Sequence, residues 1–218
     1  MSTLDKLAKM HGTDKSSDIH NYCVKYEKYL PFNRYDKLMM MEIGVLDGKS
    51  LLTWKDYFYR SHILGIDINP ECKKYEEERI TIEIGSQADG GFLSRTSEHY
   101  GPFDIILDDG SHMNDHVTYS FQHLFDSVKP GGVYIVEDCA TAYWDEYGGG
   151  YLKPSTSIEY FKSLSDDLNF RGLMNHNKPN VHARREDWLI ENSKSIPTCR
   201  TDIESINFLN GIIIVTKR

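Results

Sequence analysis

Short apolar runs alternate with amphipathic segments from Leu38 onward, a pattern typical of strands and helices that follow one another in a parallel sheet. The apolar runs predict strands at residues 38–43, 63–67, 80–84, 103–107 and 132–136, and the amphipathic segments predict helices at 50–58, 92–100 and 114–128. Two further apolar runs, 203–208 and 212–216, flank Asn210-Gly211, a dipeptide that favours a tight hairpin turn. The pattern therefore predicts an α/β fold with a mostly parallel twisted sheet, helices on both faces and a C-terminal antiparallel hairpin.

Two parts of the chain lack this regular alternation. Residues 1–34 are polar, with short helices expected at 4–10 and 21–30, and they precede the first strand. Residues 140–180 combine aromatic residues, acids and a Gly-Gly-Gly run, which is typical of a mobile lid or of a plain surface loop. A helix is expected at 157–168, whereas 175–197 fit no pattern. We expect a single domain over 1–218, with 1–34 as an N-terminal helical segment and 35–218 as a core with a lid-like insertion around 140–180.

Length and charge narrow the kind of partner. A chain of 218 residues is long enough to bury a large core, and its net charge of −8 argues against a nucleic-acid partner and in favour of a small-molecule substrate. The four cysteines are spread singly and the amino terminus has no apolar leader. No apolar run approaches the ~18 residues that cross a bilayer, so we expect a cytoplasmic protein without membrane insertion.

Acidic residues and a histidine follow two neighbouring strands of the expected sheet. Asp108, Asp109 and His112 come directly after the strand at 103–107, and Glu137 and Asp138 follow the next strand. The carboxyl ends of parallel strands meet at one edge of a sheet, so four carboxylates would lie close together there. Like charges at such a distance favour a divalent cation.

Other interpretations of these residues start from the same positions. Asp108 and Asp109 are also typical of caps for the helix that follows them. His112 and His116 are four residues apart and could bind zinc together with Asp109, although the surrounding acids favour Mg²⁺.

The ends of the first three strands are suited to a nucleotide-like ligand. Gly44 begins a turn that leads to a helix near Ser50, and a helix amino terminus offers unpaired N–H donors. Asp67 ends the second strand, where an acid commonly holds ribose hydroxyls. Gln87 and Asp89 follow the third strand and either contact an adenine edge or cap the next helix.

Several short motifs occur together between Gly12 and Arg218. They are Gly-Thr-Asp-Lys (12–15), Glu-Ile-Gly-Val (42–45), Gly-Ser-Gln-Ala-Asp (85–89), Asp-Asp-Gly-Ser-His (108–112), Glu-Asp (137–138) and Thr-Ala-Tyr-Trp with Tyr-Gly-Gly-Gly (141–150). Their joint occurrence resembles the S-adenosylmethionine-dependent, Mg²⁺-dependent O-methyltransferases of macrolide (mycinamicin-type) and rhamnosyl-tetracenomycin sugars. The resemblance implies the Rossmann-like fold of class I methyltransferases.

By matching position, the resemblance also implies roles for single residues. Asp109, Glu137 and Asp138 would hold Mg²⁺, and His112 would act beside Asp109 as the general base. The S-adenosylmethionine cofactor would be bound by Thr13, Gly44, Ser50, Asp67, Gln87 and Asp108.

The expected function is therefore O-methylation of a hydroxyl of a sugar, in a natural product or a surface polysaccharide precursor. A catechol- or phenol-type O-methyltransferase, a non-catalytic cofactor-binding subunit and a nicotinamide oxidoreductase are the alternatives. The macrolide enzymes carry a large amino-terminal auxiliary domain that helps to contact substrate and to assemble a tetramer. Because residues 1–34 take its place here, the identity of the sugar and a homo-oligomeric state are the least transferable expectations.

Overall fold

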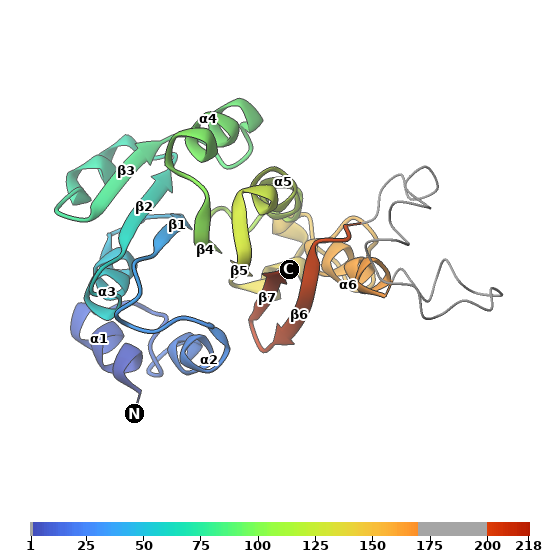
Figure 1. Ribbon diagram of the computed structural model, residues 1–218. Coiled ribbons are helices and arrows are strands. Elements are labelled where there is room, and N and C mark those ends of the chain that lie inside the picture. The colour runs from blue at the N-terminus through green and yellow to red at the C-terminus, as the bar shows by residue number, and fades with distance from the viewer. Residues whose placement is uncertain (1, 170–199) are drawn as a thin grey trace.

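The computed structural model describes residues 2–169 and 200–218, so the expectations for 175–197 lie outside the described residues. A seven-stranded sheet runs through it in the order β3-β2-β1-β4-β5-β7-β6 (Figure 1). Its strands are β1 (Met39–Ile43), β2 (His62–Asp67), β3 (Ile80–Ile84), β4 (Phe103–Asp108), β5 (Val128–Val136), β6 (Ile203–Leu209) and β7 (Ile212–Lys217). Strands β1 to β5 are parallel, and β7 is antiparallel to both β5 and β6, which confirms the predicted α/β sheet and its final hairpin.

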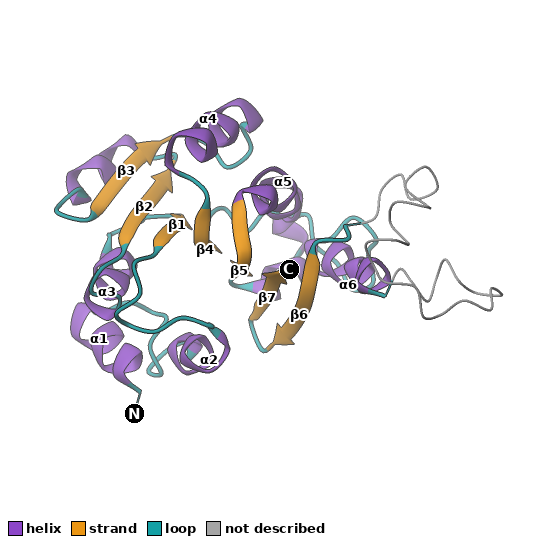
Figure 2. Cartoon of the chain, viewed as in Figure 1, coloured by secondary structure: helices purple, strands orange, loops and turns teal. Residues whose placement is uncertain are grey.

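Helices cover both faces of this sheet (Figure 2). One face carries α1 (Thr3–His11), α2 (Tyr22–Tyr29) and α3 (Lys49–Tyr57), and the other carries α4 (Gly90–Tyr100), α5 (Asn114–Leu124) and α6 (Ser157–Leu168). Each face has its own buried cluster, centred on Trp54 and Tyr26 in the first and on Phe121 and Tyr134 in the second. Strands enclosed in this way must be apolar on both sides, which explains their continuous rather than alternating hydrophobicity.

The N-terminal segment packs into the same core as the sheet. Leu4 and Ala8 of α1 and Tyr26 of α2 are fully buried, and the ring centroid of Tyr26 lies 5.3 Å from that of Trp54. The backbone N–H of Leu4 donates to Glu27 at 2.8 Å, which ties α1 to α2. Residues 2–30 therefore form one wall of the domain, next to the carboxyl ends of its central strands.

Most expected boundaries lie within two residues of those in the structure, and two differ by more. The helix predicted at 114–128 ends at Leu124, and the chain passes through a short 3₁₀ turn at Phe125–Ser127 into β5, which begins at Val128. Val128 pairs with Phe103, but regular pairing resumes only at Val133 opposite Ile105. Pro130 lies within this gap and has no N–H to donate to β4, which accounts for the interrupted pairing.

The part of the lid-like insertion that the structure describes is compactly folded. It contains 3₁₀ turns at Cys139–Tyr143 and Asp145–Tyr147, and backbone N–H groups of Gly149 and Gly150 donate back to Trp144 and Ala142 at 2.9 and 3.0 Å. The Asn114 amide also donates to the carbonyl of Tyr147 at 2.9 Å. This stretch is thus anchored to α5.

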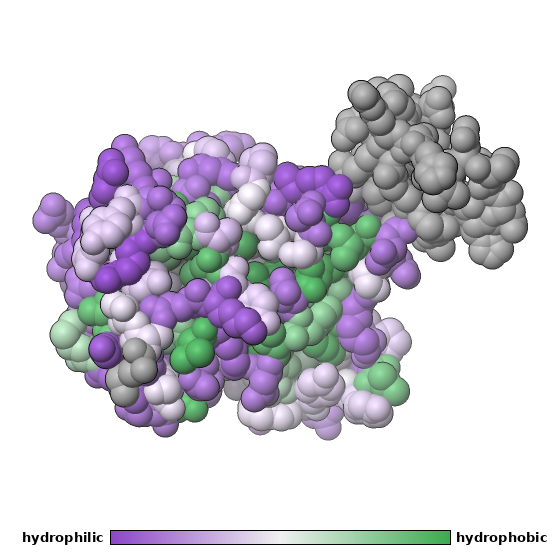
Figure 3. Space-filling view, turned by 60° about the horizontal axis from the view of Figure 1, so that its bottom comes forward, coloured by the Kyte–Doolittle hydropathy of each residue, from purple (hydrophilic) through white to green (hydrophobic). Residues whose placement is uncertain are grey.

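The exposed surface is mainly polar (Figure 3). On the face shown in Figure 3, hydrophilic residues predominate and hydrophobic ones form smaller patches. Within residues 2–169 and 200–218, no helix combines the length and the apolar character that spanning a bilayer requires.

Candidate active site

A cavity of ≈ 650 Å³ opens at the carboxyl ends of β1 to β4. The strand order changes direction between β1 and β4, and ligands of open α/β sheets bind in the crevice at such a switch point. Of the residues predicted to bind a cofactor, the cavity is lined by Thr13, Gly44, Ser50, Asp67 and Gln87. The structure thus brings together five of the six.

The Asp67 carboxylate organises the loop after β1. One oxygen accepts the backbone N–H groups of Val45 and Leu46 at 2.8 and 3.1 Å, and the other accepts that of Asn69 at 2.8 Å. Burial alone would raise the pKa of Asp67, but these backbone donors outweigh it and lower the pKa below its ordinary value. Asp67 therefore stays ionised and holds the glycine turn against β2 while it faces the cavity.

Gly44 is required by a close approach of the backbone rather than by the turn alone. Its φ is +93°, and a Cβ at this position would lie 2.1 Å from the carbonyl oxygen of Asp109. Because β1 and β4 are neighbours in the sheet, this contact lets the loop carrying Asp109 pass directly over the end of β1.

Asp108 does not reach the cavity. Its carboxylate is 1 % exposed and accepts hydrogen bonds from Ser120, Tyr134 and Gln87 at 2.5, 2.9 and 3.1 Å. Burial raises the pKa of Asp108, and these three donors oppose the shift. Successive side chains of a strand point to opposite faces, so Asp108 turns into the core where Asp109 turns to the rim. This placement favours a structural role for Asp108 over the predicted cofactor contact.

Gln87 links that internal network to the cavity wall. Its amide nitrogen donates to Asp108, and its amide oxygen accepts the backbone N–H of Ser111 at 2.6 Å. Asp89, the other residue considered for an adenine contact, caps α4 by accepting the N–H of Phe92 at 3.1 Å. Gln87 therefore fixes the loop that carries the candidate base, besides lining the cavity.

Asp109, His112 and Asp138 converge at the rim. His112 Nε2 lies 3.9 Å from Asp109 Oδ1 and 3.8 Å from Asp138 Oδ2, and one potential ligand atom of each residue lies within 4.8 Å of the others. Opposite oxygen ligands of an octahedral Mg²⁺ ion are about 4.2 Å apart with bonds of ~2.1 Å. Because the facing oxygens of Asp109 and Asp138 lie within 4.8 Å of each other, these two carboxylates fit such an ion after small adjustments, with His112 beside them. His116 is not part of the group and bonds to Ser111 at 2.9 Å instead.

Glu137, the third predicted metal ligand, is not part of this group. One carboxylate oxygen accepts the hydroxyl of Tyr26 and the other accepts Lys15 Nζ at 2.8 Å. Burial raises the pKa of Glu137, as does the nearby Asp109, while Lys15 opposes the shift. The structure therefore places Glu137 beside its two predicted partners but uses its oxygens for protein contacts, and its metal ligation stays a prediction.

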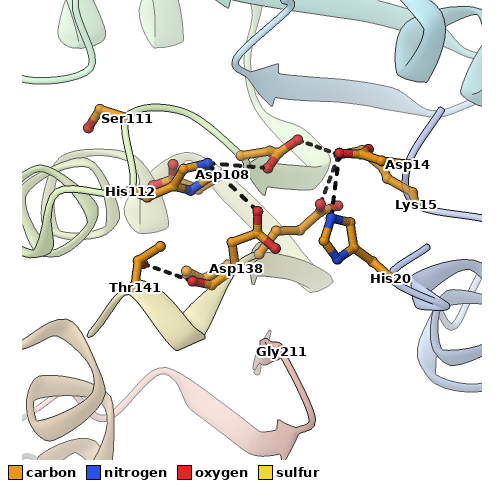
Figure 4. Close-up of polar contacts among 12 residues, drawn as sticks. Asp14, Lys15, His20, Asp108, Ser111, His112, Asp138, Thr141 and Gly211 are labelled. Atoms are coloured by element: carbon orange, nitrogen blue, oxygen red, sulfur yellow. Dashed lines mark hydrogen bonds and ion pairs between the residues drawn. The ribbon is translucent and has the colours of Figure 1, made fainter. Parts of the chain in front are cut away.

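Lys15 is a buried cation at the centre of the acids. It is 3 % exposed, forms ion pairs with Asp109 and Glu137, and lies 3.9 Å from Glu42. Burial opposes its charge, but the three carboxylates outweigh that cost and hold the pKa of Lys15 well above its ordinary value. Lys15 and His112 approach the acids from opposite sides (Figure 4).

Glu42 is a buried acid on the cavity wall. It is 0 % exposed, and within residues 2–169 and 200–218 neither of its oxygens has a hydrogen-bond partner of good geometry. Burial raises the pKa of Glu42 to about 7, although Lys15 and the Ser50 hydroxyl oppose the shift. A buried polar group of this kind, facing a cavity, is suited to a positively charged or hydrogen-donating part of a ligand.

Sequence reasoning assigned no role to Lys15, Glu42, Tyr22 or Tyr26. The sequence offered a sign that Glu42 is unusual, since it is the one acid in the apolar run Met39–Ile43. Lys15 ends a motif that the family resemblance quotes. The two tyrosines had none, because no pattern in the sequence indicates that α2 faces the acids.

Known proteins resemble this chain over most of its length. Demethylmacrocin O-methyltransferase from Streptomyces fradiae is 39 % identical over 180 residues, which cover 78 % of this chain and 45 % of the relative. Mycinamicin VI 2''-O-methyltransferase from Micromonospora griseorubida is 39 % identical over 181 residues, with coverage of 78 % and 45 %. The 2'-O-methyltransferase of 8-demethyl-8-alpha-L-rhamnosyl tetracenomycin-C from Streptomyces olivaceus is 37 % identical over 220 residues, with coverage of 97 % and 54 %. The chain thus spans about half the length of these relatives, and no protein-family model matches it.

Solved structures give the same result. The MycE methyltransferase of the mycinamycin biosynthetic pathway, in complex with Mg, S-adenosylhomocysteine (SAH) and mycinamycin VI, has a TM-score of 0.83 and 31 % identity, over 99 % of this chain and 53 % of that chain. A putative caffeoyl-CoA O-methyltransferase from Staphylococcus aureus has a TM-score of 0.52 at 16 % identity, which indicates a shared fold alone.

Proposed function

We propose that the chain transfers a methyl group from S-adenosylmethionine to a sugar hydroxyl in the presence of Mg²⁺. The proposal is supported by its homology to the macrocin, mycinamicin and rhamnosyl-tetracenomycin O-methyltransferases and by the Rossmann-like class I fold that it shares with them. The observation that carries this proposal is the cavity at the β1–β4 switch point, which opens beside Asp109, His112 and Asp138. A cavity large enough for a cofactor and a group of side chains suited to acid–base chemistry are therefore neighbours, which supports the proposal.

Residues of the chain divide the work between cofactor and acceptor. Thr13, Gly44, Ser50, Asp67 and Gln87 would bind S-adenosylmethionine along the cavity, and Asp109, Glu137 and Asp138 would hold Mg²⁺ at its edge. A divalent ion there supplies Lewis acidity that makes a sugar hydroxyl easier to deprotonate. His112 would take the proton of that hydroxyl, and a base so placed typically contributes ~10² to 10⁴ in rate.

The acceptor is proposed to be a small glycoside rather than a catechol. Support comes from the rhamnosyl-tetracenomycin relative, whose name specifies a sugar-bearing substrate, and from the MycE structure that contains mycinamycin VI. A cytoplasmic setting is part of the same proposal, since the four cysteines occur singly along the chain.

The direct test is methyl transfer by the purified protein with a panel of glycosides and catechols, with Mg²⁺ or with EDTA. We expect Mg²⁺-dependent product from at least one glycoside. His112→Ala should lower kcat by ~10² to 10⁴ and leave the affinity for S-adenosylmethionine unchanged. His99→Ala, at an exposed position of α4, is the matched control.

Three outcomes would count against parts of the proposal. Turnover of catechols alone would show that the acceptor is a catechol rather than a glycoside. An unchanged rate in His112→Ala would exclude it as the base. Binding of S-adenosylmethionine without turnover of any acceptor would favour a non-catalytic subunit.

A further inference from the structure

The two aspartates at the rim share one pattern of contacts. Asp109 presents Oδ1 to His112 while its Oδ2 accepts Lys15, and Asp138 presents Oδ2 to His112 while its Oδ1 accepts the hydroxyl of Tyr22 at 2.6 Å. Each carboxylate therefore has one oxygen held by a donor from the N-terminal segment. The other oxygen faces the space between Asp109, Asp138 and His112, where the proposed Mg²⁺ ion would lie. A carboxylate held at one oxygen cannot rotate freely, so the direction of the other oxygen is fixed.

Tyr22 is itself held from several sides. The ring of His20 stacks on it at 5.2 Å with an interplanar angle of 17°, and Lys25 Nζ lies 4.7 Å from the ring centroid. The turn of the β6–β7 hairpin closes the remaining side, because a Cβ at Gly211 would lie 2.5 Å from the Tyr22 hydroxyl. That contact needs the positive φ of +82° and the missing side chain of Gly211.

The hydroxyl has a defined role as donor. Its closest partner is Asp138, and its contact to the Gly211 carbonyl is longer at 3.4 Å. Burial raises the pKa of Tyr22, and Asp138 raises it further, so the hydroxyl keeps its proton. Nothing in methyl transfer as proposed above uses this phenol, and its ring is buried with only 4 % of Tyr22 exposed.

Resting on the proposed Mg²⁺ site, we infer that Tyr22 is a positioning residue for the divalent cation. It acts by holding Asp138 Oδ1, so that Asp138 Oδ2 faces the ion beside Asp109 Oδ1 and leaves His112 free to act as the base. Outer partners of metal-binding carboxylates typically change metal affinity by 10- to 100-fold when removed. Tyr22 does this from α2, a helix outside the strands that carry the acids.

The test is divalent-cation binding by the full chain without substrate, measured with Mn²⁺ by electron paramagnetic resonance and with Mg²⁺ by calorimetry. Tyr22→Phe removes one oxygen and keeps the buried ring. We expect its dissociation constant for the ion to rise 10- to 100-fold. Affinity for SAH and the thermal stability of the metal-free protein should stay close to those of the control.

Tyr100→Phe is the matched control, because the Tyr100 hydroxyl also donates to a carboxylate, that of Glu83, at 2.6 Å. Tyr100 lies on α4, and neither Tyr100 nor Glu83 lines the cavity. Equal cation affinity in Tyr22→Phe, Tyr100→Phe and the unchanged protein would overturn the inference. So would a parallel loss of SAH affinity and stability in Tyr22→Phe, which would indicate a general structural role. If the unchanged protein binds neither ion, the proposed Mg²⁺ site fails as well.

Discussion

Glu42→Gln is the perturbation that tests the electrostatics of the cavity most directly. Glu42 is fully buried beside Lys15, and burial raises its pKa to about 7 from the ordinary 4.5. Glutamine has nearly the same shape as a protonated glutamate and cannot ionise. The variant therefore fixes at every pH the state that the folded protein prefers for Glu42 below pH 7.

The size of the expected change in stability follows from the raised pKa of Glu42. Folded protein binds the Glu42 proton more tightly than unfolded protein, so its contribution to stability is fully present below pH 4.5 and is lost as pH rises through about 7. At ~1.4 kcal/mol per pKa unit the total is about 3 to 4 kcal/mol, of which about 2 to 3 kcal/mol is lost between pH 5 and pH 8. Glu42→Gln should consequently gain about 2 to 3 kcal/mol in stability relative to the unchanged protein between these two pH values.

The assay is urea unfolding of both proteins at pH 5 and pH 8 in EDTA. Any constant cost of burying an amide at position 42 cancels when the two pH values are compared. Glu78→Gln, at an exposed position, controls for the general effect of removing a carboxylate. A stability difference between Glu42→Gln and the unchanged protein that is the same at both pH values would refute the reasoning, because Glu42 would then titrate normally.

Two other changes test the framework around the site. Gly44→Ala should lower the free energy of unfolding by more than about 2 kcal/mol, since its Cβ would meet the Asp109 carbonyl at 2.1 Å. Urea denaturation measures this loss, and Gly131→Ala, with a φ of +79° but no atom within 4 Å of its Cβ, should cost less; equal losses would contradict the clash. Tyr134→Phe removes one of the three donors to Asp108 and should cost about 1 to 3 kcal/mol in the same assay, with SAH affinity unchanged. A loss of SAH affinity without a loss of stability would instead place Asp108 in cofactor binding.

The order of strands and helices could be predicted because buried strands and amphipathic helices leave different hydrophobic periods. The strand at 80–84 and the helix at 157–168 have the predicted bounds. The wrong boundaries at 125–131, where the helix was expected to continue and the strand to begin later, have a local cause. Val128 pairs with Phe103 of β4, so the sheet rather than the local sequence decides the conformation there.

The spacing of strands alone predicts the candidate site only where its residues follow strands, whereas Thr13, in the N-terminal segment, was reached through the family resemblance. Asp109, His112 and Asp138 come together because β4 and β5 are parallel neighbours. The cofactor role of Asp108 came from the family resemblance and stays a prediction, and its burial could not be foreseen because a sequence does not show which of two adjacent acids faces the core. Lys15 and Tyr22 lie on segments outside the sheet, and their meeting with the acids depends on how α1 and α2 pack, which no local pattern encodes.

The contact between Tyr22 and Gly211 spans 189 positions of the chain, nearly its whole length. The residues of α2 and both aspartates precede the β6–β7 hairpin in the sequence and are therefore synthesised before it. Until β7 docks between β5 and β6, the turn that confines Tyr22 is absent. At the proposed Mg²⁺ site, a chain without the β6–β7 hairpin would therefore hold Tyr22, and through it Asp138, less firmly.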